Sequence, residues 1–486
     1  MNETIKTSEK KIIPLKEILL ITCILFLLFS CDLFNVKPVP GANTSKQFWA
    51  YNYSTKGNYR ITAELLAEGI YCDVWVEKNS GVNASTAQEI AYVYDNNIYY
   101  KMISVFGFSN ANVTIPYNES NIAYNINTMD LADILGNGDG KLTILLLDIK
   151  DGYDFETQRS YIDGYFWAGD LYKISGSNRC DMIYIDTYPG VPGGNTSNMT
   201  LAHEMQHLMN FVTGLICREY DMDLWINEGL SAAAEWVYAD EHPMDKLSWF
   251  QNNGNGNNIK GLIDKGNNFF VWGNREDESI YANLDDYSTV YLFFQWLRLQ
   301  TDAKIYKDII SSQHHDHNAV TSAFYNRVEV TENNWETLLK TWLTANYINT
   351  DNDLFGYKDD PVLHQIRIPA PLTIEKFISL FPGEGVYSQI NEGFNMPSQQ
   401  GNIRYAEISE NILLTYNKNV LNNKSPEEGL TTGSPIEPNI PFTTNARFSI
   451  APYNGPYRID AGYFHRQNQT GRNLIMPLNP VIGIME

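Results

Sequence analysis

Positive charge is scarce in this sequence. The 486 residues include 35 Lys and Arg against 57 Asp and Glu, so the formal net charge is -22. A nucleic-acid ligand requires a clustered cationic surface, and docking on anionic lipid requires a basic patch. We therefore expect neither nucleic acid nor an anionic lipid surface as a partner. Hydrophobic residues make up 43% of the chain and aromatic residues 13%, which is typical of a folded globular protein.

A long hydrophobic run is also lacking at the N-terminus. The apolar run at residues 18–29 has twelve residues, whereas a membrane-spanning helix needs about 20. It follows four lysines within residues 1–17, a pattern typical of a secretory signal. The run ends Leu28-Phe29-Ser30-Cys31, which resembles the lipobox of bacterial lipoproteins. We predict a signal peptide over residues 1–30 and an exported lipoprotein, held at the membrane of the cell envelope by a lipid on Cys31. The alternative is an ordinary cleaved signal or an uncleaved anchor.

Cysteine is rare beyond Cys31. The remaining chain has Cys72, Cys180 and Cys217, an odd number that allows at most one disulfide. Their spacing fits no metal motif, so we expect small buried hydrophobic side chains. Removal of the signal takes away four Lys and three Glu and leaves a charge of 31 minus 54, or -23. The acidity therefore belongs to the exported part, where net charge favours solubility.

Beyond the signal, the composition divides the chain into four parts. Residues 31–47 are rich in Pro, Gly, Ser and Asn and are expected to form a tether. Residues 48–84 alternate polar and apolar positions, which predicts a small N-terminal β unit. Residues 85–352 combine helical periodicity with short buried strands. Residues 353–486 contain short alternating runs among frequent Pro and Gly, which predicts a β-rich C-terminal domain. The expected fold class is α+β.

Periodicity places the individual elements. Strands are predicted at residues 59–65, 70–76, 142–147, 181–186, 404–408, 412–416, 447–450 and 457–464. Helices are predicted at residues 87–106, 199–212, 224–239, 286–299 and 335–348. Long loops are predicted at residues 251–266 and 425–441.

The segment with the clearest chemistry is Leu201-Ala202-His203-Glu204-Met205-Gln206-His207-Leu208-Met209, which contains HExxH. His203 and His207 lie one helical turn apart, so both imidazoles can reach one ion, while Glu204 is displaced around the helix. The apolar stripe of this helix lies elsewhere, so we expect the histidines to face a cleft. The pattern predicts one Zn²⁺ per chain. The alternative is a pair of surface histidines on an amphipathic helix.

A catalytic zinc needs a third protein ligand and an open position for water. The next predicted helix contains Trp225-Ile226-Asn227-Glu228-Gly229-Leu230-Ser231-Ala232-Ala233-Ala234-Glu235, and twenty residues separate His207 from Glu228. With these two segments the sequence resembles the gluzincin metallopeptidases and, within them, the hyicolysin family of secreted bacterial metallopeptidases. The resemblance implies that residues 85–352 form a zincin-like domain, with a mixed sheet, an active-site helix and a helical second lobe. It also implies that Glu228 is the third zinc ligand.

Further roles follow from the same resemblance. Glu235 would hold a zinc-bound histidine in orientation, and a solvent-facing glutamate is an equal alternative. Tyr287 would stabilise the oxyanion of the reaction. Tyr291 shares its helix face, and core packing is an alternative for both tyrosines. The strand at residues 181–186 would be the edge strand that pairs with an extended substrate.

These residues predict a zinc-dependent metalloendopeptidase that hydrolyses proteins or peptides outside the cytoplasm, with Glu204 as general base. A surface-exposed binding lipoprotein with a non-catalytic HExxH helix is the alternative from another class. Zinc-dependent hydrolysis of a non-peptide amide or ester is a weaker one. His314, His315 and His317 form a second dense cluster, which we interpret as a solvated loop rather than a second metal site.

Overall fold

The computed structural model describes residues 44–107, 141–154, 161–171, 176–217, 222–251, 281–358, 360–366, 380, 382–391, 394–399 and 401–420. The predicted signal peptide, Cys31, nearly all of the tether and the strands at 447–450 and 457–464 lie outside these residues. The same is true of the loop at 425–441 and nearly all of the loop at 251–266. These predictions, and the predicted domain boundaries, stay predictions.

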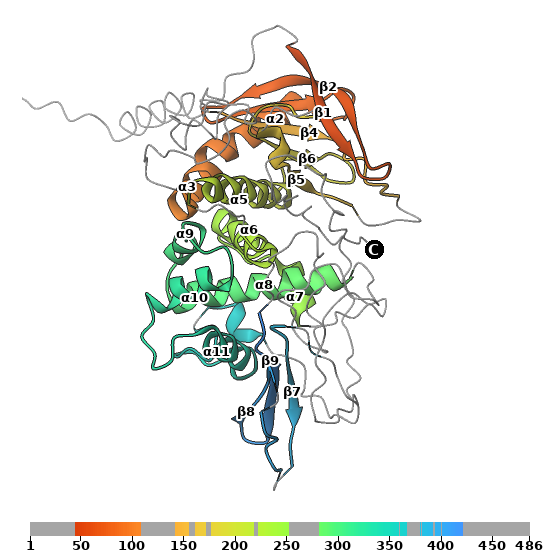
Figure 1. The fold of residues 1–486 in the computed structure, drawn as a ribbon. Helices are drawn as coiled ribbons and strands as arrows, with labels where there is room; N and C mark the ends of the chain where they lie inside the picture. The colour runs from red at the N-terminus through yellow and green to blue at the C-terminus, as the bar shows by residue number, and fades with distance from the viewer. Residues whose placement is uncertain are drawn as a thin grey trace, which may run out of the picture.

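A six-stranded mixed sheet occupies one end of the molecule (Figure 1). Its strands follow the order β1-β2-β3-β4-β6-β5. Antiparallel pairing joins β1, β2 and β3, whereas β3, β4 and β6 are parallel and β5 is antiparallel to β6. The strands are β1 (Ser45–Asn52), β2 (Gly57–Glu68), β3 (Cys72–Glu77), β4 (Leu142–Leu147), β5 (Gly164–Phe166) and β6 (Met182–Asp186). The strands predicted within residues 48–84 thus continue into the same sheet as the later ones.

The sequence of β4 shows why this part of the sheet is buried on both faces. All six residues, Leu-Thr-Ile-Leu-Leu-Leu, are buried, as expected for a strand in a parallel region that is covered on both sides. Ile144 and Leu146 join the main hydrophobic cluster beneath the helices. Leu145 and Leu147 point the other way, into a second cluster formed with side chains such as Phe48. The alternation follows from the two-residue period of a strand.

Helices cover the face of the sheet that carries the main cluster (Figure 1). They are α2 (Ala84–Val93) and α5 (Asn195–Cys217), and α3 (Tyr99–Phe106) follows α2 and packs against α5. A π-helical turn, Tyr94–Ile98, joins α2 to α3, so the helix predicted at 87–106 is confirmed with one irregular turn. The Asp95 carboxylate in this turn accepts hydrogen bonds from the backbone N–H groups of Ile70 (2.5 Å) and Tyr71 (2.9 Å). It thereby ties the helix to the connection between β2 and β3.

A second, helical lobe follows α5. It consists of α6 (Leu224–Ala239), α7 (Met244–Phe250), α8 (Tyr281–Gln300), α9 (Lys304–Ile310), α10 (His317–Tyr325) and α11 (Trp335–Ile348). The helices predicted at 199–212, 224–239, 286–299 and 335–348 are confirmed as α5, α6, α8 and α11. The helices α7, α9 and α10 were not predicted, because seven to nine residues are too few for a clear periodic signal.

A three-stranded antiparallel sheet lies at the opposite end of the molecule (Figure 1). It consists of β7 (Gly385–Gln389), β8 (Ile403–Ser409) and β9 (Ile412–Asn417), in the order β7-β9-β8. The strands predicted at 404–408 and 412–416 are therefore confirmed. This sheet packs on α11, where the Tyr387 hydroxyl donates to the Leu343 carbonyl oxygen (2.6 Å). The architecture confirms the α+β class with a zincin-like arrangement of sheet, active-site helix and helical lobe.

The strand at residues 181–186 forms as predicted, but it is not an edge strand. β6 pairs in parallel with β4 on one side and antiparallel with β5 on the other. Among the described strands, the edge of the sheet on this side belongs to β5, which has three residues. A strand this short gave no alternating signal in the sequence, so the prediction assigned the edge to its neighbour.

Two of the cysteines are described, and both are buried free thiols, Cys72 and Cys180, as predicted. The side chain of Cys217 lies outside the described residues. Within the described part of the chain, no helix combines the length and apolarity that crossing a membrane would require.

Candidate metal centre

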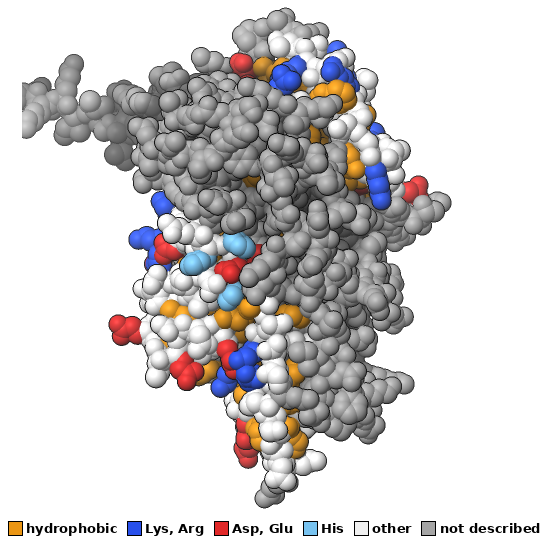
Figure 2. Space-filling view, in the orientation of Figure 1, with side chains coloured by type: hydrophobic (Ala, Val, Ile, Leu, Met, Phe, Trp, Pro, Cys, Tyr) orange, Lys and Arg blue, Asp and Glu red, His pale blue; other side chains and the backbone are white. Residues whose placement is uncertain are grey.

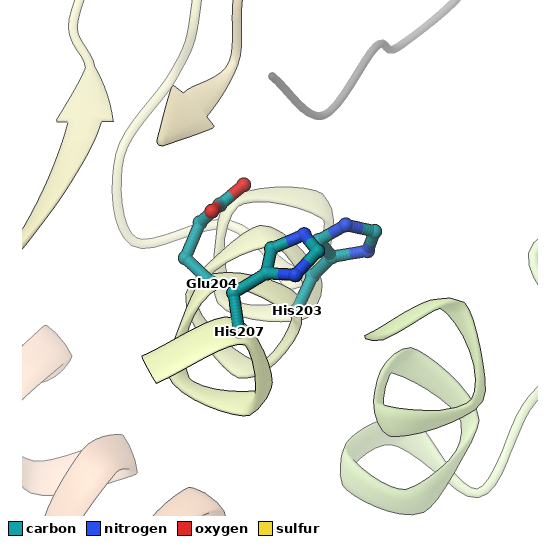
Figure 3. A group of neighbouring side chains, drawn as sticks. All are labelled: His203, Glu204 and His207. Atoms are coloured by element: carbon teal, nitrogen blue, oxygen red, sulfur yellow. The ribbon is translucent and has the colours of Figure 1, made fainter. Parts of the chain in front are cut away.

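The HExxH segment lies on α5, between the sheet and the second lobe (Figure 1). His203, Glu204 and His207 are each 0% exposed, so the alternative of surface histidines is wrong. Their ligand atoms all lie within 4.8 Å of one another. In Figure 3 the two imidazoles lie on one side of α5, and the Glu204 carboxylate extends to a different side of the helix. This is the arrangement that the helical spacing predicts.

A third side chain converges on the two histidines from α6. The Glu228 Oε2 atom lies 3.5 Å from His203 Nε2 and 3.5 Å from His207 Nε2. Two ligand atoms that lie about 2.0–2.1 Å from one ion, at a tetrahedral angle, are roughly 3.4 Å apart. The spacing of these atoms therefore fits a shared zinc ion. In addition, Glu228 Oε2 is buried and has no hydrogen-bond partner among the residues that the structure describes, which is costly unless a cation is bound there.

The charges in the cluster suit a cation as well. Burial by itself raises the pKa of the Glu228 carboxyl group, but the neighbouring His207 and His203 outweigh burial and lower this pKa below its usual value. Burial lowers the pKa of His207, because an imidazolium ion loses its hydration there. The two effects compete, since a neutral His207 attracts the carboxylate less strongly. Burial is the larger effect on His207, so we assign a neutral imidazole and an anionic Glu228, which are the forms that a metal ion requires.

The second ring nitrogen of His203 is held by Glu235. His203 Nδ1 lies 2.9 Å from Glu235 Oε1, and Lys246 Nζ on α7 donates to both oxygens of Glu235 at 2.8 and 2.9 Å. Glu235 is 0% exposed, so the alternative of a solvent-facing glutamate is wrong. Because a carboxylate only accepts, Nδ1 carries the proton and the lone pair of Nε2 faces Glu228.

The second ring nitrogen of His207 is held in a similar way by Ser231. The Ser231 hydroxyl donates its single hydrogen to Gln206 Oε1. Its oxygen must therefore accept from His207 Nδ1, 2.9 Å away. Both histidines thus carry the proton on Nδ1 and direct Nε2 to the common point.

No sequence pattern assigns a role to Ser231, Gln206 or Lys246. Ser231 and Glu235 follow Glu228 by three and seven residues on α6, so the helical period could have placed all three on one face. Gln206 lies inside HExxH, where any residue type fits the pattern. Lys246 lies on a short separate helix and carries no local signal.

Gly229 allows α6 and α8 to pack closely behind the site. A Cβ atom at this position would lie 2.3 Å from Cε2 of Phe294, far inside van der Waals contact. The glycine next to Glu228 is therefore required by helix packing.

The two candidate tyrosines on α8 have different surroundings. The Tyr287 ring is 4% exposed, and its centroid lies 6.4 Å from that of His203. The Tyr291 hydroxyl lies 2.6 Å from His242 Nδ1, and His242 Nε2 lies 3.1 Å from Asp360 Oδ2. The structure thus brings Tyr287 to the histidines and places Tyr291 in a separate buried network.

The cluster of His314, His315 and His317 is not a continuous loop. His317 begins α10, and its ring packs against Trp335 with centroids 5.6 Å apart. His315 Nδ1 lies 3.5 Å from Asp223 Oδ1. Figure 2 shows histidine and acidic side chains together on the face over α9 and α10. Among the described residues, the group of potential metal ligands around His203, Glu204 and His207 includes none of these three histidines, so a second metal site gains no support.

The fold and the buried cluster of His203, Glu204 and His207 together form a zincin-like arrangement that could hold a metal ion. The chain is 31% identical over 298 residues to the neutral metalloprotease ShpI of Staphylococcus hyicus. The match covers 59% of this chain and 59% of that protein, which is less than two thirds of the relative's length. No protein-family profile matches the chain. The similarity supports a relationship to metalloproteases.

The network around Tyr291 generates a prediction about acid stability. Burial raises the pKa of Asp360, but hydrogen bonds from His242 and from the backbone outweigh it and lower this pKa to about 2. A carboxyl group whose pKa is depressed in the folded protein stabilises the fold at pH values above its pKa in the unfolded chain. This contribution is lost as the pH falls through its pKa in the folded protein. We expect Asp360→Asn to lower the free energy of unfolding by on the order of 2 kcal/mol at pH 6, and by much less at pH 2.

Urea unfolding of both proteins between pH 2 and pH 6 measures this difference. Asp302→Asn is the control, since Asp302 pairs with Arg327 but its side chain is 52% exposed, and we expect a change within about 1 kcal/mol. If Asp360→Asn lowers the free energy of unfolding by the same amount at pH 2 and at pH 6, the prediction is wrong.

Proposed function

We propose that this chain is a zinc-dependent metalloendopeptidase of gluzincin type that hydrolyses proteins or peptides outside the cytoplasm. The observation that carries the proposal is the convergence of Glu228 Oε2 on the Nε2 atoms of His203 and His207, at 3.5 Å from each. Two imidazoles and one carboxylate are the ligand set of many catalytic zinc sites, which keep a fourth position for water or substrate. The similarity to a neutral metalloprotease over 298 residues supports the same assignment.

The ligands His203, His207 and Glu228 would hold one Zn²⁺ per chain. When bound, Zn²⁺ supplies polarisation of the substrate carbonyl and lowers the pKa of water toward about 7. The chain itself supplies the proton transfers. Glu204 lies on α5 within reach of the same point, and it would take a proton from the attacking water and return it to the leaving amine.

Tyr287 would stabilise the negative charge that develops on the carbonyl oxygen of the substrate. Attack on a peptide carbonyl develops an oxyanion, which a positioned hydroxyl donor stabilises. Tyr287 is buried near His203, whereas the Tyr291 hydroxyl contacts His242. These contacts favour Tyr287 over Tyr291 for this role.

The variant Glu204→Gln tests the general base. The amide cannot accept the proton from water, so we expect casein cleavage to fall by about 10²–10⁴-fold, while one zinc per chain is retained. Metal analysis and a casein assay on the same preparation measure both quantities, and a chelator should abolish wild-type cleavage until zinc is restored. Glu329→Gln changes an exposed glutamate and is the matched control.

A zinc-loaded Glu204→Gln protein that cleaves casein at the wild-type rate contradicts the mechanism. Wild-type protein that binds zinc tightly but cleaves no protein substrate favours the surface-exposed binding lipoprotein instead.

The variant Tyr287→Phe tests the oxyanion donor. We expect kcat to fall by about 10²–10³-fold with KM changed little, because the lost hydrogen bond forms only in the transition state. Tyr291→Phe is the matched control, since its hydroxyl is bound to His242, and we expect it to keep the wild-type kcat below its unfolding temperature. Equal kcat losses in the two variants contradict the assignment.

We also propose that a lipid on Cys31 anchors the exported protein in the cell envelope. The segment Leu28-Phe29-Ser30-Cys31 after a short apolar run supports this. Labelled palmitate should enter the wild-type protein and a Cys23→Ser control when each is expressed in a bacterial host. We expect no label in Cys31→Ser. Label that persists in Cys31→Ser, or wild-type protein without label, contradicts the anchor.

A further inference from the structure

Lys246 is a buried cation without a role in the mechanism described above. It lies on α7 and is 7% exposed. Lysine is almost never buried unless it is paired, because the ammonium group loses its hydration. Its Nζ atom lies 2.8 Å from Glu235 Oε1 and 2.9 Å from Glu235 Oε2. The ammonium group therefore holds both oxygens of one carboxylate.

The same carboxylate holds a metal-ligand histidine. Glu235 Oε1 lies 2.9 Å from His203 Nδ1, and His203 Nε2 lies 3.5 Å from Glu228 Oε2. A continuous line of contacts thus runs from Lys246 through Glu235 and His203 to the proposed zinc position. The lysine enters this line from α7, which is separate from the two helices that carry the ligands.

The buried charges of the site also require this lysine. Glu204, Glu228 and Glu235 are each at most 1% exposed. Three carboxylates, one Zn²⁺ and one ammonium group have formal charges of -3, +2 and +1, which sum to zero. Without Lys246 the buried site would carry a net negative charge, and Glu235 would lose the partner that fixes its orientation.

We propose that Lys246 is a positioning residue for the metal centre. By holding both oxygens of Glu235, it keeps the His203 ring turned so that Nε2 faces Glu228. The inference rests on the proposed function, since it concerns affinity for the zinc that this function requires. Residues that orient a metal ligand typically change metal affinity by about 10–100-fold when they are replaced.

The test measures zinc affinity directly, by competition with a chromophoric chelator at constant pH. We expect Lys246→Met to bind zinc about 10–100-fold more weakly than the wild type. The visible spectrum of the Co²⁺-substituted protein should change as well, because the orientation of one ligand changes. Lys246→Arg keeps a cation that can donate to both oxygens and should restore most of the affinity.

Lys101→Met is the matched control. Lys101 Nζ lies 2.6 Å from Asp240 Oδ2, at the C-terminal end of the helix that carries Glu235. Its loss removes a lysine contact to α6 without touching the line to His203. We expect wild-type zinc affinity and an unchanged Co²⁺ spectrum in this variant.

A double-mutant cycle separates action through Glu235 from a general effect on folding. If Lys246 acts through Glu235, the double variant Lys246→Met/Glu235→Gln should bind zinc as weakly as Glu235→Gln and no more weakly. The double variant also leaves no unpaired carboxylate at position 235, so the comparison stands even where Lys246→Met alone does not fold. Circular dichroism of the metal-free proteins checks folding.

Two results overturn the inference. One is wild-type zinc affinity and an unchanged Co²⁺ spectrum in folded Lys246→Met. The other is a double variant in which the losses of the two single changes multiply. Failure of the wild-type protein to bind zinc is a different result, because it overturns the proposed function itself.

Discussion

Two buried imidazoles that direct Nε2 to one point each need a hydrogen-bond acceptor on the opposite nitrogen, and the packing of α6 against α5 meets this need. Glu235 accepts from His203 and Ser231 accepts from His207, both at 2.9 Å. The same helix directs Glu228 to the two Nε2 atoms. A buried polar atom without a hydrogen-bond partner destabilises the fold by about 1–3 kcal/mol. The contact between the two helices avoids this destabilisation at the second nitrogen of each histidine.

The rest of the second lobe holds α6 in place. Gly229 permits the close approach of Phe294 on α8, and α8 also carries Tyr287. At the far end of α6, Arg298 Cζ lies 3.6 Å from the centroid of the Trp236 ring. Nearby, His242 contacts both the Tyr291 hydroxyl and the Asp360 carboxylate. Segments distant in the sequence therefore fix the position of α6 relative to α5, and with it the distance between Glu228 and the histidines.

Much of this arrangement could be predicted from the sequence, and the failures have identifiable physical causes. Long helices such as α5, α6 and α8 were predicted because apolar residues recur on one face over several turns. The short helices α7, α9 and α10 were missed because they complete only two turns or so. The three residues of β5 gave no alternation, so the sheet edge was assigned to β6. The surface alternative for His203 and Glu235 failed because packing of a second lobe covers both.

The sequence by itself determined the relations within a single helix. HExxH places His203 and His207 one turn apart with Glu204 displaced, and this follows from the helical period alone. Which side chains meet between helices was decided only by the tertiary structure. The 3.5 Å approach of Glu228, the contact of Lys246 with Glu235 and the different surroundings of Tyr287 and Tyr291 all depend on how α5, α6, α7 and α8 pack. No local pattern encodes those distances, because they arise from side chains far apart in the chain that fill one shared interior.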